Sequence, residues 1–402
     1  MKIALPYGNG LIEAEVPDRN VAVSYSSKKE KPMKKAGIEE SVKALNVERG
    51  KSVVIITTDI TRACPDRELL PLILKRCHNA KEVKLVVALG LHPAMGRKEL
   101  SEKLGTAVIE RYRVLNHNTE DCVDLGKSSR NNAIEVNREV MDADVKIATG
   151  FIEPHFFAGF SGGRKSIMPG VSGRRAVYEN HSYRMIDDPR AREGVLEGNP
   201  VHEDACEHAE RAGLDFIVNV TLNRDREITH VFCGDPFEAH KKGCMSVEEA
   251  CGMNVKDKAD IALTSNGGAP LDMNLYQTVK GIAHASSFVS DAGIIIIASR
   301  CDKKDKESFE RLHTSVGSAR DVLKFIRKNE PIEDQWENQI LARAQLRHRI
   351  FLLSDMNKER VKTMGVEPIS SIEEGLKKAF EILGSDASIA LLPEGPMVYA
   401  RT

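Results

Sequence analysis

Three short segments combine glycine with histidine, lysine, arginine or aspartate, and each directly follows a stretch typical of a β-strand. They are residues 57–62 with Asp59 and Arg62, residues 90–93 with His92, and residues 150–170 with His155, Gly162, Gly163, Arg164, Lys165 and Ser166. Loops that follow strands carry the active sites of many α/β enzymes. We therefore interpret the three segments as parts of one candidate site.

Histidine is the residue type in these segments whose chemistry is easiest to anticipate. Imidazole titrates near neutral pH, so it serves both as a general base and as a metal ligand. His92 and His155 lie in the loops, and His181 follows the third one. A single histidine is more often structural, but three of them near Asp59 and Arg62 favour a reactive site. Arg62 could bind a carboxylate with two hydrogen bonds; a capping Asp59 and a surface Arg62 are the plainer alternative.

The run SGGRKS at residues 161–166 allows two functional interpretations, phosphate binding and covalent attachment of a ligand. Paired glycines let backbone N–H groups approach a phosphate, and Lys165 adds a positive charge. The run is not a Walker A loop, because Arg164 stands where that motif requires glycine before the lysine. Lys165 is also a candidate covalent attachment point, since a desolvated lysine becomes nucleophilic. A tight turn with a solvated basic pair is the alternative.

The elements expected around these segments alternate between strands and helices. Strands are predicted at residues 51–57, 83–88, 145–149, 217–222, 228–232, 259–265, 293–299, 350–354 and 388–392, and helices at 66–78, 97–104, 199–213, 236–251, 275–285, 316–328, 334–348 and 372–383. This alternation predicts an α/β protein whose mainly parallel sheets carry helices on both faces. Residues 18–50 show no clear pattern.

A polar stretch at residues 254–260 marks an expected domain boundary. It predicts an N-terminal α/β domain at residues 1–257, which carries the lysine and histidines, and a C-terminal α/β domain at 258–402. Ligands in such folds lie beyond the carboxyl ends of strands and often between domains. We therefore expect the active site in the interdomain cleft.

The second half of the chain offers weaker signals. Tyr276, Gln277 and Lys280 fall on one predicted helix, where Gln277 and Lys280 share a face because they are three residues apart. Taken alone, that face is best interpreted as solvated. Trp336 is the only tryptophan of the chain, and a single tryptophan is usually a packing residue.

Composition limits the class of protein. The chain has 402 residues, more than one ordinary domain, and is 41% hydrophobic and 29% charged, as soluble globular proteins are. Its 58 Lys and Arg against 59 Asp and Glu give a net charge of −1, which argues against a nucleic-acid partner. We find no membrane-spanning run, no secretory signal and no C-x-x-C pair, and expect a cytoplasmic protein. His202 and His208 are expected at the surface of a helix.

Taken together, these motifs resemble the nickel-dependent lactate racemase family. The resemblance rests on D-x-T-R at residues 59–62, G-L-H at 90–92, P-H-F-F-A-G-F-S-G-G-R-K-S-x-x-P-G at 154–170, E-N-H at 179–181, Y-Q-T-x-K at 276–280 and D-Q-W at 334–336. His155 and Lys165 are ten residues apart, and Lys165 and His181 sixteen, as in that family. The combination is specific, whereas no single motif is.

The resemblance implies a racemase or epimerase of a small, lactate-like 2-hydroxy acid. It implies a nickel pincer nucleotide, bound covalently to Lys165, with His181 as the nickel ligand and His92 and His155 as general acids and bases. The remaining implied contacts are Gly162, Gly163, Arg164 and Ser166 with the cofactor, and Asp59, Arg62, Tyr276, Gln277, Lys280 and Trp336 with the substrate. For Arg164 a contact with the cofactor phosphate is the favoured expectation, and exposure to solvent is the alternative.

Such a cofactor would explain the implied roles chemically. The hydrogen on Cα is poorly acidic, so it leaves more easily as hydride to a pyridinium ring while a base takes the hydroxyl proton. Two bases are then needed, one for each stereoisomer. We expect the substrate and, transiently, the cofactor-biosynthesis proteins as partners, with no nucleic acid or membrane; a homo-oligomer stays open.

Several alternatives remain at this point. The same chemistry could act on a larger 2-hydroxy acid, such as malate, an aryl-lactate or a sugar acid. The SGGRKS run could instead serve a phosphate-binding nucleotide enzyme, which needs an acidic Mg²⁺ site for which Asp59 is the only strong candidate. Two weaker alternatives are a cofactor carrier without catalysis and a pyridoxal-phosphate enzyme with its Schiff base on Lys165.

Overall fold

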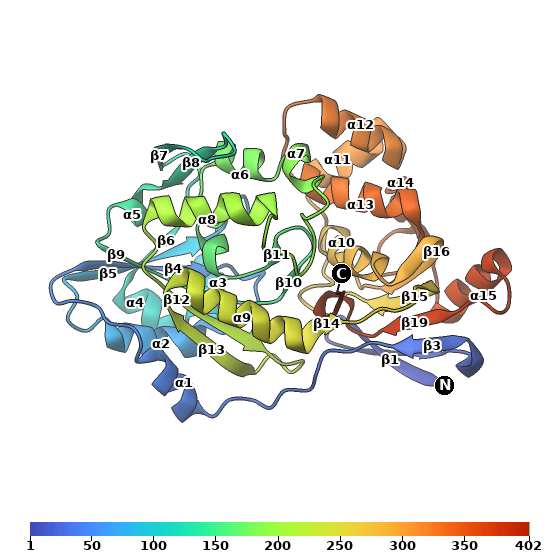
Figure 1. The fold of residues 1–402 in the computed structure, drawn as a ribbon, viewed down its shortest axis with the longest axis horizontal. Coiled ribbons are helices and arrows are strands. Elements are labelled where there is room, and N and C mark those ends of the chain that lie inside the picture. Colours follow the sequence, from blue (N-terminus) through green and yellow to red (C-terminus); the bar gives the residue numbers. More distant parts are fainter. Residues whose placement is uncertain (402) are drawn as a thin grey trace.

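The computed structural model describes residues 1–401 and shows two α/β lobes that lie side by side (Figure 1). The sheet of the N-terminal lobe has the order β13 (Ile228–Gly234), β12 (Phe216–Leu222), β9 (Val145–Phe151), β4 (Ser52–Thr58), β5 (Glu82–Ala88) and β6 (Arg113–Asn116). All of these strands are parallel except β13, which runs antiparallel at one edge.

The sheet of the C-terminal lobe is parallel throughout. Its order is β18 (Glu367–Ile369), β17 (Arg349–Leu353), β16 (Val289–Ala298), β15 (Ala259–Ser265), β19 (Ile389–Leu392) and β3 (Val21–Ser24). Two mainly parallel sheets, one in each lobe, confirm the predicted fold class.

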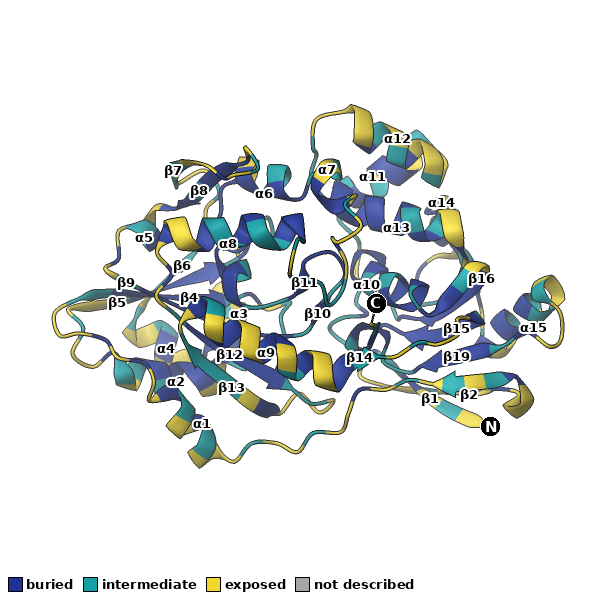
Figure 2. Cartoon of the chain, in the orientation of Figure 1, coloured by how far each residue is buried: buried dark blue, intermediate teal, exposed yellow. Residues whose placement is uncertain are grey.

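The central strands are buried on both faces, which explains their composition. In β4, the residues Val53, Val54, Ile55 and Ile56 are at most 1% exposed, and a parallel strand covered on both sides needs such a continuous apolar run. Figure 2 shows both sheets as buried layers, with exposed residues mainly on the outer faces of the helices.

Helices cover both faces of each sheet. Those of the N-terminal lobe are α1 (Lys35–Val42), α2 (Asp66–Arg76), α3 (Arg97–Leu104), α4 (Thr106–Arg111), α5 (Arg138–Met141), α6 (Arg174–Asn180), α7 (Tyr183–Ile186), α8 (Pro200–Ala212) and α9 (Pro236–Cys251). Those of the C-terminal lobe are α10 (Leu275–Ser286), α11 (Glu307–Val316), α12 (Ala319–Lys328), α13 (Gln335–Arg347), α14 (Lys358–Thr363) and α15 (Ile372–Leu383).

Local capping signals set where several helices begin. The side chain of Asn199 accepts hydrogen bonds from the first turn of α8, and that of Asp235 does the same for α9. Each cap is followed by a proline, which needs no hydrogen bond at the first helical position. Helix α8 ends at Gly213, which adopts a left-handed conformation with φ of 66°. These signals explain why the predicted bounds of both helices are close to the observed ones.

Short elements escaped the sequence analysis. They are the helices α1, α4, α5, α6, α7, α11 and α14, the strands β3, β6 and β18, the hairpin β1 (Lys2–Tyr7) and β2 (Gly10–Glu15), the hairpin β7 (Cys122–Lys127) and β8 (Ala133–Asn137), the pairs β10 (Pro154–His155) with β11 (Gly159–Phe160) and β14 (Gly252–Met253) with β20 (Tyr399–Ala400), and the 3-10 turns η1 (Asp18–Asn20), η2 (Gly163–Ser166) and η3 (Gly395–Met397).

The first residues of the chain belong structurally with the last ones. Strand β3 pairs in parallel with β19, with Val21 opposite Ile389, and Figure 1 shows the blue β3 beside the red β19. Leu5 of β1 lies in the same apolar core as Ile261 of β15. The chain therefore passes from the C-terminal lobe to the other lobe after β3. The expected boundary between residues 257 and 258 describes only the second crossing, where the chain returns to the C-terminal lobe. It stays a prediction.

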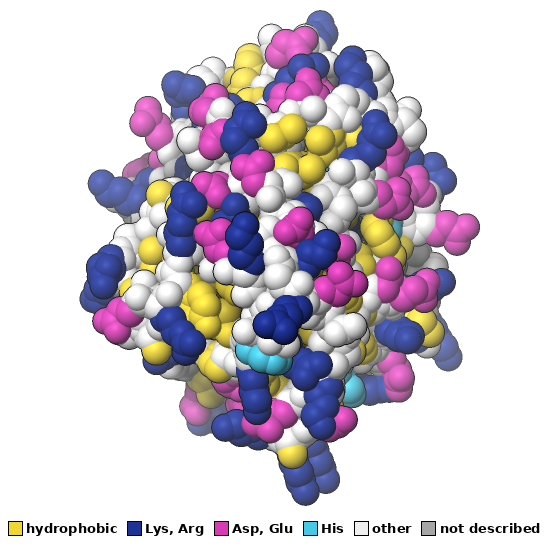
Figure 3. All heavy atoms as spheres, turned by 90° about the vertical axis from the view of Figure 1, so that its left-hand side faces the viewer, with side chains coloured by type: hydrophobic (Ala, Val, Ile, Leu, Met, Phe, Trp, Pro, Cys, Tyr) yellow, Lys and Arg dark blue, Asp and Glu magenta, His cyan; other side chains and the backbone are white. Residues whose placement is uncertain are grey.

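The surface carries both signs of charge. Figure 3 shows basic and acidic side chains interspersed over the face of the N-terminal lobe, in keeping with the formal net charge of −1. Among the helices within residues 1–401, none has the length and apolarity that crossing a membrane requires.

Candidate active site

The loops after β4, β5 and β9 open into one cavity between the lobes. These three strands are neighbours in the sheet, so their carboxyl ends meet at one edge. The predicted residues that line the cavity are Asp59, Arg62, His92, His155, Gly162, Lys165, Ser166 and His181 from the N-terminal lobe, and Tyr276, Gln277, Lys280 and Trp336 from the C-terminal lobe. Gly163 and Arg164 are the predicted residues that do not line it.

His92 is held by a buried carboxylate. Its Nδ1 lies 2.6 Å from Oδ2 of Asp59, which is 2% exposed and also accepts hydrogen bonds from the N–H and hydroxyl of Thr61. Burial alone would raise the pKa of Asp59, but the hydrogen bond and charge of His92, the charge of Arg62 and the Thr61 hydroxyl outweigh it and lower this pKa. An ionised Asp59 only accepts, so in the neutral ring of His92 the proton is on Nδ1 and Nε2 offers a lone pair.

The hydrogen bonds of His155 differ from those of His92, because here Nδ1 is the acceptor. Its Nδ1 accepts the backbone N–H groups of Ala158 at 3.3 Å and Phe157 at 3.5 Å, and its ring stacks on Phe156 at 4.7 Å. In the neutral ring, Nε2 therefore carries the proton. Burial and then the positive charges of Lys165, Lys280, Arg62 and Arg164 hold the pKa of His155 well below its usual range. One histidine of the cavity thus offers an acceptor and the other a donor.

Lys165 lies in the 3-10 turn η2, in apolar and cationic surroundings. Its Nζ is 5.7 Å from the centre of the Phe157 ring. Burial first, and then the charges of Arg164, Arg62 and Lys280, hold the pKa of Lys165 well below that of an ordinary lysine. A lowered pKa makes the amine easier to deprotonate, and the deprotonated amine is the nucleophilic form that covalent attachment requires.

The two glycines before Arg164 have a packing reason of their own. Both have positive φ, 76° at Gly162 and 54° at Gly163. A Cβ on Gly162 would lie 2.6 Å from Oδ1 of Asn219, and one on Gly163 would lie 2.7 Å from the ring of His240. Only glycine fits this turn, whatever ligand the turn binds.

The alternative that Arg164 is exposed to solvent is wrong, because this residue is 2% exposed. Nη2 donates to the carbonyl of Ala158 at 2.6 Å, and Nη1 donates to that of Gly162 at 3.3 Å and lies 3.0 Å from Nε2 of His240. The guanidinium is thus committed to protein atoms behind the loop. These contacts favour a supporting role for Arg164 over direct contact with a ligand.

His181 ends helix α6 with its ring in an aromatic setting. Phe157 and Trp336 approach the ring edge-on, with centroids at 5.1 Å and 5.2 Å. Nδ1 of His181 is buried and has no hydrogen-bond partner among the residues that the structure describes. Burial and then the charge of Lys165 hold the pKa of His181 well below its usual range. The imidazole is therefore neutral, with a ring nitrogen unused by the protein, as a metal ligand must be.

No site made by protein donors alone surrounds His181. Within the described residues 1–401, no group of three or more His, Cys, Asp or Glu side chains is placed to hold a metal ion. A metal bound through His181 would need its other donors from a bound group.

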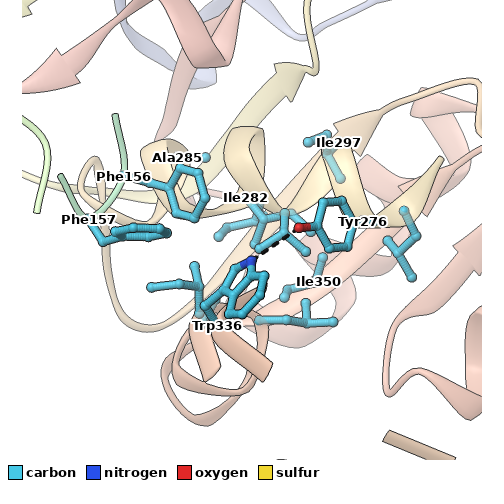
Figure 4. Close-up of a cluster of buried hydrophobic side chains, with 14 of the residues drawn as sticks. Phe156, Phe157, Tyr276, Ile282, Ala285, Ile297, Trp336 and Ile350 are labelled. Carbon is cyan, nitrogen blue, oxygen red and sulfur yellow. Dashed lines mark hydrogen bonds between the residues drawn. The ribbon is translucent and has the colours of Figure 1, made fainter. Parts of the chain in front are cut away.

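Of the predicted residues on helices α10 and α13, Tyr276, Gln277 and Trp336 are buried and Lys280 is partly buried, which corrects the expected solvated face. Lys280 Nζ donates to Oε1 of Gln277 at 2.7 Å, and Trp336 Nε1 donates to the hydroxyl of Tyr276 at 3.1 Å. Figure 4 shows this second bond, with Phe156 and Phe157 beside Trp336 in the same buried cluster. The helix face is buried because the N-terminal lobe packs against it.

Sequence reasoning missed four ionisable residues that line the cavity, Glu153, His284, Lys306 and Glu337. Burial raises the pKa of Glu153, and it raises the pKa of Glu337 to about 8. Burial and the charge of Arg62 lower the pKa of Lys280 to about 8. The sequence held only a faint signal: Glu153 is two residues before His155, and Glu337 directly follows Trp336.

A buried ion pair fixes the loop that carries Asp59 and Arg62. Lys103 of α3 lies 3.2 Å from Asp66, and its Nζ donates to the carbonyls of Arg62 at 2.6 Å and Cys64 at 2.8 Å. Asp66 also accepts the hydroxyls of two strand-end threonines, Thr58 at 2.7 Å and Thr149 at 2.5 Å. The ends of β4 and β9 are thereby joined beneath the cavity.

The histidines of helix α8 also differ from the prediction. His208 is fully buried, with Nδ1 2.8 Å from the carbonyl of Asp204 and Nε2 3.0 Å from that of Ala133. His202 is partly buried, and its ring stacks on His240 at 6.4 Å. The expectation of surface histidines is wrong for His208, because helix α8 packs this face against β8.

Comparison with known proteins adds independent findings. Residues 7–194 match the family model described as lactate racemase N-terminal domain, and residues 254–399 match the one described as lactate racemase C-terminal domain. The lactate racemase of Thermoanaerobacterium thermosaccharolyticum is 38% identical over 99% of both chains, and the lactate racemase of Lactiplantibacillus plantarum is 34% identical over 99% of both.

Solved structures agree with these matches. The lactate racemase apoprotein from Thermoanaerobacterium thermosaccharolyticum superposes with a TM-score of 0.95 at 36% identity, covering 100% of both chains. A protein from Thermotoga maritima superposes with a TM-score of 0.72 at 17% identity, covering 94% of this chain and 100% of its own. The second similarity concerns the fold alone.

Proposed function

The chain belongs to the lactate racemase family and is an isomerase; from this premise we propose that it racemises a small 2-hydroxy acid, lactate first, with a nickel pincer nucleotide attached to Lys165. One observation supports the proposal above the others. The cavity brings together a partly buried lysine with a lowered pKa, a histidine with an unused ring nitrogen, and two further histidines with complementary proton positions.

The residues present fit the proposed cofactor. Lys165 would hold it covalently, and His181 would bind its nickel through a ring nitrogen that no protein group uses. A square-planar or tetragonal nickel site needs further donors, which the protein around His181 does not supply. When bound, the cofactor would supply a hydride acceptor for the hydrogen on Cα.

The two histidines would move the hydroxyl proton. His92 accepts it on Nε2, and Asp59 then stabilises the imidazolium through the hydrogen bond to Nδ1. This contact revises the expected part of Asp59, whose carboxylate would act through His92 rather than on the substrate. His155 holds a proton on Nε2 and would return one to the keto oxygen from its own side of the cavity. With the proton positions exchanged, the pair serves the other stereoisomer.

The cations of the cavity would hold the substrate carboxylate. Arg62 and Lys280 come from different lobes and both line the cavity, so a carboxylate bound between them would be fixed in orientation. Gln277 keeps the Lys280 amine in place through the bond of 2.7 Å. Tyr276 and Trp336 would form apolar walls and exclude water from the reacting carbon.

The glycine-rich turn would hold the phosphate of the nucleotide. Gly162 and Ser166 line the cavity, whereas Gly163 and Arg164 lie behind it. We therefore assign the phosphate contact to the first two. Arg164 would support the turn through its bonds to Ala158 and Gly162.

The test needs a host that makes the cofactor, supplied with nickel. We expect the peptide containing Lys165 to carry a nucleotide-sized adduct, and the purified protein to convert D-lactate and L-lactate into a racemic mixture, followed by chiral chromatography. Lys165→Ala is the matched control and should show neither. A bare Lys165 in a host that loads another lactate racemase would contradict the proposal. An adduct without turnover of lactate would direct the search to larger 2-hydroxy acids.

A further inference from the structure

Glu337 is a cavity residue whose side chain forms no hydrogen bond or ion pair with any of the described residues 1–401. It lies in the first turn of α13, lines the cavity and is 3% exposed. Its Oε2 is buried and accepts no hydrogen bond. Lys306, a basic residue of the same region, pairs with Asp334 and Glu333 instead. Buried carboxyl groups are normally paired or hydrogen-bonded, so this one calls for an explanation.

The surroundings of Glu337 keep its carboxyl neutral. The charged and titratable groups that act on it are Lys280 and Tyr276 of α10, Arg62 of the loop after β4, Asp334 before α13 and Lys306 before α11. Burial is the largest influence on the pKa of Glu337 and raises it to about 8. The positive charges of Lys280 and Arg62 lower this pKa, and the negative charge of Asp334 raises it further. At neutral pH the group therefore carries a proton and can donate an O–H hydrogen bond.

The chemistry of the cavity indicates what this donor is for. Lys280 and Arg62 are the cations that a substrate carboxylate would approach, and within residues 1–401 the hydrogen-bond partner of the Lys280 amine is the neutral Gln277. Helices α10 and α13 are held together near this point by the bond between Trp336 and Tyr276. An ionised Glu337 would repel the carboxylate, whereas a protonated one can donate to it in a strong, charge-assisted bond.

We propose that Glu337 is a substrate-binding residue whose neutral carboxyl donates a hydrogen bond to the carboxylate of the 2-hydroxy acid, beside Lys280. This inference rests on the proposed function, because it takes a 2-hydroxy acid as the ligand. It predicts that substrate binding weakens once Glu337 ionises.

The single tryptophan offers a binding assay that needs no turnover. Trp336 precedes Glu337 and contributes the only indole fluorescence of the chain. We would titrate the cofactor-loaded protein with L-lactate and D-lactate and follow this signal. At pH about 7, Glu337→Ala should raise Kd about tenfold or more, as expected for a lost hydrogen bond to a charged group. Glu337→Gln keeps a neutral donor and should stay within about threefold.

The pH dependence separates this role from a purely structural one. Between pH about 7 and about 9, ionisation of Glu337 should raise the Kd of the wild type about tenfold. Lys280 titrates in the same range, so the comparison is made in Lys280→Arg, whose guanidinium stays charged. The rise should persist in Lys280→Arg and vanish in the double variant Lys280→Arg with Glu337→Gln.

Each outcome decides the inference. An unchanged Kd for Glu337→Ala, or a flat profile in Lys280→Arg while Glu337 is present, would overturn it. Failure of the proposed function looks different, because the loaded wild type would then neither racemise lactate nor respond in fluorescence. If Glu337→Ala does not fold, the inference is still tested by comparing Lys280→Arg with the double variant Lys280→Arg and Glu337→Gln. The quantity compared is the dependence of Kd on pH.

Discussion

Nδ1 of His92 lies 2.6 Å from Oδ2 of Asp59, whereas Nδ1 of His155 accepts backbone N–H groups. His92 and His155 are thus held in opposite tautomers by different kinds of partner. A carboxylate stabilises a protonated His92, while the amides facing His155 and the cations around it oppose its protonation. The pair is chemically unequal although each member would serve one stereoisomer.

Asp59→Asn tests this relationship. The amide can donate to Nδ1 and would favour the wrong tautomer of His92, so kcat should fall about 10²- to 10⁴-fold while KM changes much less. The measurement is initial-rate kinetics with each lactate isomer. Nickel content and the mass of the Lys165 peptide serve as controls and should be unchanged. A kcat within about threefold of the wild type would disprove the proposed part of Asp59.

The histidine variants test the proton transfers. His92→Ala and His155→Ala should each retain the adduct on Lys165 and bound nickel, because neither residue is proposed to hold the cofactor. Each should lose at least about 10²-fold in kcat, the usual contribution of a positioned acid or base. Mass spectrometry and metal analysis report retention, and chiral chromatography reports turnover. Full activity of either variant would remove that histidine from the mechanism.

Variants of Lys165 and His181 should lose different parts of the proposed cofactor. Lys165→Ala should lose the covalent adduct altogether, whereas His181→Ala should keep the adduct and lose most of its nickel. The reason is that one residue would hold the organic group and the other only the metal. Intact-protein mass and metal content of the same preparations give both answers. Nickel retained at wild-type level in His181→Ala would exclude His181 as its ligand.

The ion pair beneath the cavity should matter for stability. Lys103→Met leaves Asp66 buried without its cation, which should lower the free energy of unfolding by about 3–5 kcal/mol. Urea denaturation measures the change. Lys98→Met on the same helix is the matched control, because Lys98 is 90% exposed and 4.0 Å from Glu102. We expect no measurable change there; equal effects in both variants would refute the argument.

Stability should fall as the pH drops below about 6.5, in part through His117. Burial lowers the pKa of this histidine from 6.5 to about 4, so between these values the unfolded chain binds a proton that the native one does not. His117 therefore contributes stability that is complete above pH 6.5 and is lost towards pH 4, about 3 kcal/mol in total.

His117→Gln tests the linkage. The slope of unfolding free energy against pH should fall by up to about 1.4 kcal/mol per pH unit, the value for one proton. His78→Gln, the same substitution at an exposed histidine, is the control variant. The same slope in wild type and His117→Gln would show that His117 does not take part.

Local patterns predicted most of the fold and much of the cavity lining. Strand β15 and helices α9 and α15 begin and end where predicted, because apolar periodicity and capping residues act over a few positions. The three strand-end loops also meet as expected, since neighbouring parallel strands end at one edge.

What the sequence could not give depends on contacts between distant residues. Asp59 and His92 are 33 positions apart, and nothing local indicates that they pair. Lys280 and Gln277 look like a solvated face until the other lobe covers them. Glu337 stands among polar residues, so only the packed structure shows that it lines a cavity.

The pairing of β3 with β19 has a consequence for biosynthesis. Because residues 25–388 separate the two strands, β3 leaves the ribosome long before its partner exists. At typical translation rates of about 5–20 residues per second, the interval is on the order of 20–70 s. Throughout that time the apolar edge of β3 has no strand to pair with, while the N-terminal lobe can already fold. The nascent C-terminal lobe is therefore the part of this protein that most needs protection by chaperones.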